Sequence, residues 1–215
     1  MRGDSIVIED HHRKAAAGIA PIVRATLANG DKPIGVTVAG ESGSGKSEIA
    51  AALAEALGTD GISCVILGQD DYFVYPPKSN DAARRKDIGW VGPQEVKLDL
   101  LDEHMRAIID GAETLKKPEV VYEDDTVESE VLNTSGTRVV IAEGTYTTLV
   151  PSATHHAFID RDYTQTRKHR EKRNRDAAEL DAFTDRVLEI EHGIISAQKA
   201  KADIIINEDY SVSPA

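Results

Sequence analysis

Short apolar runs alternate along the chain with longer segments in which apolar residues recur at helical spacing. The short runs are rich in Val and Ile and predict buried strands at 34–39, 62–68, 139–142, 157–160 and 204–206. The longer segments predict helices at 11–29, 48–57, 95–109 and 179–200. Strands that alternate with helices indicate a doubly wound, mostly parallel α/β sheet with helices on both faces.

Three stretches depart from this alternation. Residues 74–92, which include Pro76, Pro77 and Gly89, predict a long irregular segment. The weak alternation of residues 117–134 predicts a β-hairpin, and residues 164–176 predict a very basic helix. We expect residues 1–215 to form a single domain, in which about 70–135 are an insertion or a cap over the sheet edge.

The sequence Gly-Glu-Ser-Gly-Ser-Gly-Lys-Ser at 40–47 fits the phosphate-loop pattern G-x-x-x-x-G-K-[ST]. It lies between a predicted strand and a predicted helix, whose N-terminal dipole favours anions. The glycines let successive N–H groups point at a phosphate chain. We therefore expect nucleotide contacts from Gly40, Glu41, Ser42, Gly43, Ser44, Gly45, Lys46 and Ser47. Lys46 supplies a charge for the β/γ-phosphates and Ser47 a Mg²⁺ ligand, and the whole unit predicts a P-loop NTPase fold.

The charge and composition of the chain argue against several classes of partner and location. The net charge is −12 and the pI about 5.0, which argues against nucleic acid or an anionic membrane as a partner. Cys64 is the only cysteine, so the chain forms no internal disulfide. No apolar stretch approaches the ~18 residues of a membrane span, and the first residues lack a signal-peptide core. These features predict a cytoplasmic protein.

Carboxylates follow two of the predicted strands. Asp70 and Asp71 come after the strand at 62–68, and Glu143 follows the strand at 139–142. Ligands of open α/β sheets bind beyond the carboxyl ends of the strands. Asp70, or Asp71 in its place, could act as a general base, and Asp70 and Glu143 could hold Mg²⁺ directly or through water. The alternatives are an Asp-rich turn and a surface Glu that opens the next helix.

The basic stretch at 164–176 carries three arginines at helical spacing, Arg167, Arg170 and Arg173. Arginine side chains stabilise the negative charge that spreads over a phosphoryl group during transfer. Beside a phosphate loop we favour a closing lid at about 163–176. A solvated, salt-bridged helix is the alternative reading of the same charges.

Taken in order, these residues make the chain resemble the uridine kinase / phosphoribulokinase-like branch of P-loop kinases from about residue 33 to 207. The likeness also rests on Gln69-Asp70 with an aromatic close behind, Trp90-Val-Gly-Pro93, Tyr122 after a proline, Glu143-Gly144 and Ala202-Asp203-Ile-Ile-Ile206. It implies transfer of a phosphoryl group from ATP, with Mg²⁺, to a hydroxyl of a small molecule. It matches Asp70 to the catalytic acid, Glu143 to the Mg²⁺-associated acid, and Arg167, Arg170 and Arg173 to the lid.

The departures from that family concern the acceptor. Val91 stands where uridine kinases carry the Asp that grips the ribose, and acidic residues at 123–128 replace the groups that frame the pyrimidine. We therefore disfavour uridine, since its recognition depends on such partners. Arg84 and Arg85 could bind a sugar phosphate. The aromatic candidates for the acceptor pocket, each of which could instead pack in the core, are Tyr72, Trp90, Tyr122 and Tyr146.

The sequence thus predicts a Mg-ATP-dependent kinase whose acceptor is a nucleoside, sugar, sugar phosphate or hydroxy acid, with the insertion at about 70–135 binding that acceptor. The alternative is a nucleotide-dependent regulator or P-loop NTPase that acts on a macromolecular partner. The choice between Asp70 and Asp71, and the existence of a homo-oligomer, stay open at this point.

Overall fold

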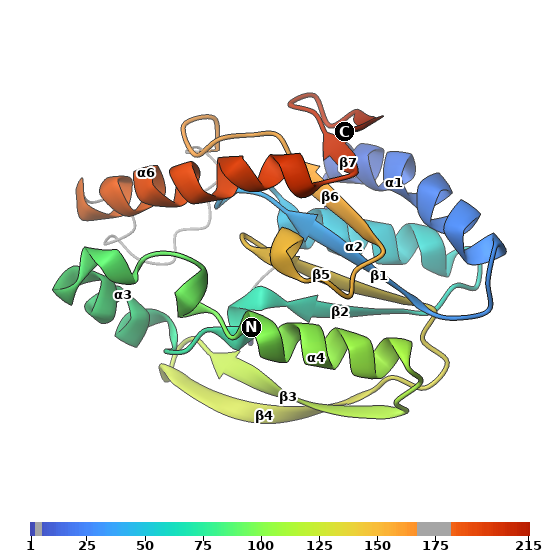
Figure 1. Ribbon diagram of the computed structural model, residues 1–215, viewed down its shortest axis with the longest axis horizontal. Helices are drawn as coiled ribbons and strands as arrows, with labels where there is room; N and C mark the ends of the chain where they lie inside the picture. The colour runs from blue at the N-terminus through green and yellow to red at the C-terminus, as the bar shows by residue number, and fades with distance from the viewer. Residues whose placement is uncertain (3–5, 167–181) are drawn as a thin grey trace.

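Six strands form the central sheet of this computed structural model, which describes residues 1–2, 6–166 and 182–215. They are β1 (Ile34–Ala39), β2 (Cys64–Gly68), β5 (Val139–Gly144), β6 (His155–Ile159), β7 (Ile204–Ile206) and β8 (Val212–Pro214). The sheet order is β2-β5-β1-β6-β7-β8, and only β8 runs antiparallel to its neighbour. The predicted mostly parallel α/β sheet is confirmed (Figure 1).

The register of the strands brings their carboxyl ends to one edge. Ala39 pairs with Gly144 between β1 and β5, and Gly68 pairs with Glu143 between β2 and β5. The segments that follow β1, β2 and β5 therefore leave the sheet side by side. This edge is where an open α/β sheet binds its ligands.

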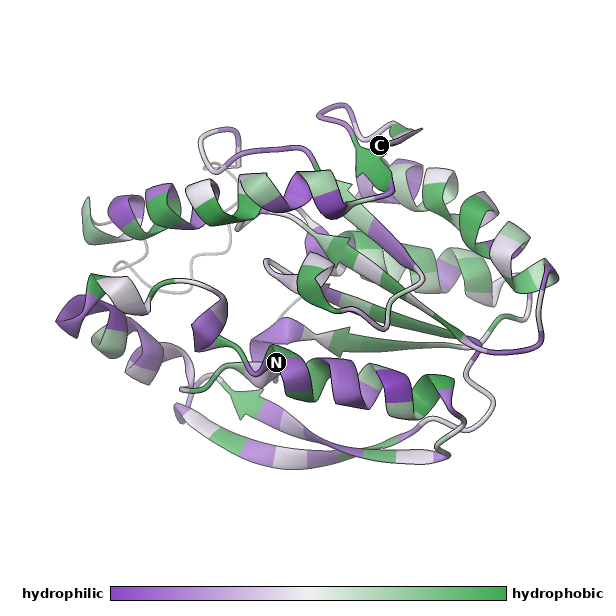
Figure 2. Cartoon of the chain, viewed as in Figure 1, coloured by the Kyte–Doolittle hydropathy of each residue, from purple (hydrophilic) through white to green (hydrophobic). Residues whose placement is uncertain are grey.

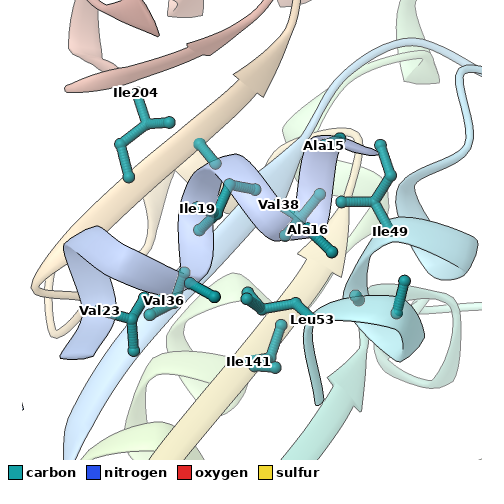
Figure 3. Close-up of a cluster of buried hydrophobic side chains, with 14 of the residues drawn as sticks. Ala15, Ala16, Ile19, Val23, Val36, Val38, Ile49, Leu53, Ile141 and Ile204 are labelled. Carbon is teal, nitrogen blue, oxygen red and sulfur yellow. The ribbon is translucent and has the colours of Figure 1, made fainter. Parts of the chain in front are cut away.

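Helices cover both faces of the sheet. The elements α1 (Asp10–Ala28) and α2 (Lys46–Gly58) pack on one face, where the apolar cluster of Figure 3 includes Ile19, Leu53 and Ile141. On the other face α4 (Leu98–Ile109) and α6 (Ala182–Ser196) pack against Val140 and its neighbours. Successive residues of a strand face opposite sides of the sheet, and in the central strands the residues on both sides are apolar. Both faces of the sheet are therefore apolar, and the central strands are largely green in Figure 2.

A hairpin and a short helix occupy the stretch between β2 and β5. The hairpin, predicted at 117–134, consists of β3 (Thr114–Val121) and β4 (Thr126–Asn133), and it lies beside α4 in Figure 1. The irregular segment predicted at 74–92 is wrong in part, because α3 (Pro77–Lys86) is helical. The helix predicted from 95 begins at 98, after a 3₁₀ turn at Pro93–Glu95.

The helix predicted at 179–200 is helical over its described part, where α6 is followed by a 3₁₀ segment at Ala197–Lys201. Arg167, Arg170 and Arg173 of the predicted lid lie outside the described residues. Across the described ranges, no helix combines the length and the apolar character that a bilayer crossing requires.

Candidate active site

The segment between β1 and α2 has the backbone of a phosphate cradle. Gly43 and Gly45 have φ angles of 75° and 94°, which side chains with a Cβ rarely adopt. A Cβ at Gly45 would lie only 2.9 Å from His12 Nε2 of α1. The curled loop leads directly into Lys46, the first residue of α2, so its N–H groups gather at a helix N-terminus.

The polar side chains of this loop fit a bound phosphate chain. The Ser44 hydroxyl is buried and has no hydrogen-bond partner among the described residues. The Lys46 ammonium donates to the backbone oxygen of Glu41 at 2.9 Å, so it already lies over the loop. A buried hydroxyl without a partner and an ammonium held over a concave backbone both suit an anionic ligand.

Glu143 and Asp70 form the acidic side of the site. Glu143 keeps part of its surface open to the cavity, although protein atoms surround it on most sides. Burial, and next the charge of Asp70, raise the pKa of Glu143 to about 7, while Lys46 and a hydrogen bond with Ser47 oppose that rise. These four residues therefore lie together on the wall of one cavity.

These acids and Ser47 also fit a magnesium ion. No group of three or more His, Cys, Asp or Glu side chains forms a metal cage within the described ranges. Mg²⁺ is usually held by one or two carboxylates together with substrate phosphates, not by an all-protein cage. Two carboxylates and a hydroxyl beside a phosphate loop are such a set. A bound cation would also relieve the repulsion between Asp70 and Glu143.

Two cavities meet at this edge of the sheet. One, of about 240 Å³, is lined by the phosphate loop, Glu143 and residues of α6. The other, of about 200 Å³, is lined by residues of α3 and by Tyr122 of the hairpin. Asp70, Phe73 and Arg84 line both cavities and so form their common wall.

Arg84 is fixed by two carboxylates. Its Nε and Nη2 donate to the two oxygens of Glu95, and Nη2 also donates to Glu191 of α6 at 2.8 Å. Glu95 is fully buried, and it accepts further hydrogen bonds from Asn80 Nδ2 and from the backbone N–H of Gly92, each at 3.1 Å. A buried carboxylate needs such partners, because desolvation otherwise penalises its charge.

Several predicted site residues lie elsewhere. Asp71 is buried, bonded to Lys117 Nζ at 2.7 Å and to the N–H of Val120 at 2.9 Å, so it does not face the cavities. Tyr72 is fully buried and its hydroxyl contacts His104 Nδ1 at 2.9 Å. These two side chains turn away because β2 ends in a 3₁₀ turn over Gln69–Tyr72 that leaves only Asp70 exposed.

Most of the remaining residues predicted to bind the acceptor also lie away from the two cavities. Tyr146 is fully buried, and Trp90 donates its indole N–H to Asn80 Oδ1 at 2.9 Å without lining either cavity. Arg85 is paired with Asp81 at 2.7 Å on the exposed side of α3. Of the predicted acceptor residues, only Arg84 and Tyr122 line the second cavity.

Sequence reasoning missed Asn80 and Asp81, which line the second cavity, and the carboxylates of Glu95 and Glu191. The signal that could have found the first two is their spacing, since Asn80 and Asp81 each precede an arginine by four residues. That spacing places each pair on one helix face. Pro76 and Pro77 favour an irregular segment in the sequence-based prediction, although Pro77 is the first residue of α3.

A further contact joins the phosphate loop to the segment that precedes the predicted lid. Glu41 accepts a hydrogen bond from the Tyr163 N–H and contacts His192 Nδ1 of α6, both at 2.6 Å. Thr166 donates its hydroxyl to the Ser42 oxygen at 2.8 Å. The last residues described before position 167 are thus anchored on the loop itself.

Comparison with known proteins agrees with this geometry. The model of the Phosphoribulokinase / Uridine kinase family matches residues 34–209. The chain belongs to this family. The predicted enzyme class, a kinase that phosphorylates a hydroxyl group, is thereby confirmed at the level of the family.

Two curated relatives and one solved structure show the range of the family. The chain is 29% identical over 196 residues to a bifunctional alpha-galactosidase/sucrose kinase of Mediterraneibacter gnavus, covering 86% of this chain but only 21% of that much longer protein. It is 28% identical to a uridine kinase of Ligilactobacillus salivarius, covering 83% and 86% of the two chains. The phosphoribulokinase of Rhodobacter spheroides has a TM-score of 0.62 at 14% identity, with 83% and 71% covered, and shows the shared fold.

Proposed function

We propose that this family member is a Mg-ATP-dependent kinase that transfers the γ-phosphoryl group to a hydroxyl of a small molecule. The observation that carries the proposal is the position of Asp70. Its carboxylate lies on the wall shared by the phosphate-loop cavity and the second cavity. A base in that position can reach a hydroxyl in one cavity while the phosphates occupy the other.

The phosphate side of the site has a role for each residue. The backbone N–H groups of 41–47 and the Lys46 ammonium would hold the phosphates, and Ser47, Glu143 and Asp70 would hold Mg²⁺. The ion, when bound, neutralises charge on the phosphate oxygens. The loop and Lys46 fix the position of the phosphate chain, which is the larger part of what a phosphoryl-transfer enzyme does. ATP as the nucleotide is an expectation from the family.

On the acceptor side, Asp70 would orient the hydroxyl and accept its proton. Asp71 is an unsuitable base, because its carboxylate is engaged with Lys117 and Val120. The second cavity is built almost entirely by the segment 70–135, which supports that segment as the acceptor-binding part of a single domain. A cavity of about 200 Å³ beside Asp70 supports a small molecule as the acceptor.

Two further parts of the proposal come from sequence. Arg167, Arg170 and Arg173 would close over the transferring phosphoryl group and exclude water, and the anchoring of Tyr163 and Thr166 on the phosphate loop supports a lid that starts there. Uridine remains disfavoured as the acceptor. Val91, at the position where uridine kinases carry an Asp, is buried and does not line the second cavity.

The direct test is ADP release by the purified protein, with Mg-ATP and a panel of nucleosides, sugars, sugar phosphates and hydroxy acids. We expect slow release with ATP alone and a clear rise with one acceptor class. Chelation of Mg²⁺ and the substitution Lys46→Ala should both abolish the rise. If ATP binds but no acceptor raises ADP release, the kinase proposal fails and a regulator or an NTPase with a macromolecular partner takes its place.

A further inference from the structure

The charge of Arg84 in the second cavity is already cancelled. Its Nε and Nη2 are bonded to both oxygens of Glu95, and Nη2 also reaches Glu191 at 2.8 Å. Two carboxylates thus face one guanidinium. A phosphate or carboxylate on an acceptor would meet a group with no positive charge to spare.

Arg84 also cannot turn toward an anionic acceptor at low cost. Glu95 is fully buried, and its remaining partners are the neutral donors Asn80 Nδ2 and the Gly92 N–H. If Arg84 left, the Glu95 carboxylate would stay buried without a counter-charge, which is strongly unfavourable. The guanidinium is therefore held in place as part of the cavity wall.

The other charges around this cavity are also paired or negative. Asp81 lines it and is paired with Arg85 at 2.7 Å, and the amino group of Met1 lies 3.3 Å from Asp71. Asp70 adds a further carboxylate to this wall. The described wall thus carries no unpaired cation that would attract an anion.

The same wall suits a molecule with many hydroxyl groups. The carboxylates of Asp70 and Asp81 accept hydrogen bonds, and Arg84 Nη1 has no hydrogen-bond partner within the described residues, so it can donate to an oxygen. Phe73 and Tyr122 add aromatic surface to the wall. A sugar presents hydroxyl groups at its edges and C–H groups on its faces, which matches polar groups set beside aromatic rings.

We propose that the acceptor is an uncharged polyol, a free sugar or the sugar portion of a neutral molecule, and that the paired state of Arg84 excludes sugar phosphates and hydroxy acids. This inference rests on the proposed kinase function and narrows it. It also argues against Arg84 and Arg85 as binders of a sugar phosphate, since both are engaged with carboxylates.

The first test measures kcat/KM for ADP release with sucrose, D-fructose and glycerol against D-fructose 6-phosphate, D-ribulose 5-phosphate and D-glycerate. We expect a neutral acceptor to exceed every anionic acceptor by at least roughly tenfold, the scale of one partly screened charge interaction. An anionic acceptor that gives the highest value would overturn the inference and leave the kinase proposal intact. A flat response to these six acceptors and to the nucleosides of the wider panel would instead count against both.

The second test changes the charge of the wall. Glu191→Gln removes one of the two carboxylates that face Arg84, and should raise the anionic-to-neutral ratio of kcat/KM by roughly tenfold. Glu189→Gln makes the same change at an exposed position of the same helix and should leave the ratio within about twofold. If the two variants give equal ratios, Glu191 does not set the charge that the acceptor meets, and the inference is wrong.

Discussion

Asp70 and Asp71 are neighbours in sequence, but their surroundings differ. Substitution of the first should therefore affect catalysis, and substitution of the second should affect stability. Asp70 is exposed at the wall between the two cavities. Asp71 is buried and bonded to Lys117 and to the Val120 N–H. We predict that Asp70→Asn impairs phosphoryl transfer and leaves the fold intact, whereas Asp71→Asn destabilises the fold.

The size of each effect follows from these contacts. Removing one partner of a buried ion pair costs about 3–5 kcal/mol, because the other charge stays buried. Lys117, which is 6% exposed, keeps a second carboxylate in Glu130 at 3.1 Å, so the lower end, about 3 kcal/mol, applies to Asp71→Asn. Loss of a general base lowers kcat by about 10²–10⁴-fold, and we expect a loss of this size for Asp70→Asn. Because Asp70 is exposed, the same substitution should change the free energy of unfolding by no more than about 0.5 kcal/mol.

Two assays separate the effects. Urea unfolding gives the free energy of unfolding of each variant, and acceptor-dependent ADP release at saturating Mg-ATP gives kcat under conditions where the variant is folded. ATP affinity measured on the same samples shows whether the phosphate loop is intact. The reasoning is refuted if Asp70→Asn keeps its acceptor-dependent kcat, or if Asp71→Asn loses activity at unchanged stability.

Three further substitutions can be tested by urea unfolding. Tyr146→Phe removes a buried hydroxyl that has no hydrogen-bond partner among the described residues, so stability should stay equal or rise by up to about 1 kcal/mol. Gly144→Ala should cost about 1–3 kcal/mol, because a Cβ there would lie 2.2 Å from Gln69 Cβ. For Asp102, burial would raise the pKa, but hydrogen bonds from Ser152 and the nearby Arg106 together outweigh it and hold the pKa below its ordinary value. Its contribution to stability is thus present above about pH 3.9 and lost as the pH falls further, so the deficit of Asp102→Asn at pH 7 should shrink at pH 3.

The phosphate side of the site could be predicted because its information is local. Residues 40–47 are contiguous, and Asp70 and Glu143 each follow an apolar run that predicts a strand. Once the strands are parallel, their carboxyl ends meet at one edge without further knowledge of the fold. The same reasoning could not separate Asp70 from Asp71, because the direction of each side chain is set by the 3₁₀ turn and by Lys117, which is 46 residues away.

The acceptor side could not be predicted because its stabilising contacts are distant in sequence. The helix α3 buries only Asn80, so it has no apolar stripe that a periodicity search would detect. Its first turn is held by Asp125 of the hairpin, whose carboxylate accepts from the N–H groups of Lys78 at 2.7 Å and Ser79 at 3.0 Å. A cap supplied by a residue more than forty positions away leaves no local signal.

The two sides of the site also differ in how easily they can change. The phosphate loop depends on backbone conformation and on glycines, so few substitutions preserve it. The charge of the acceptor cavity depends on Arg84 and its partners Glu95 and Glu191, which come from α3, a 3₁₀ turn and α6. A single change from Glu to Gln alters that charge without touching the phosphate loop. We therefore expect the preference of this chain for neutral or anionic acceptors to depend on a few carboxylates around one arginine, while the phosphate site stays the same.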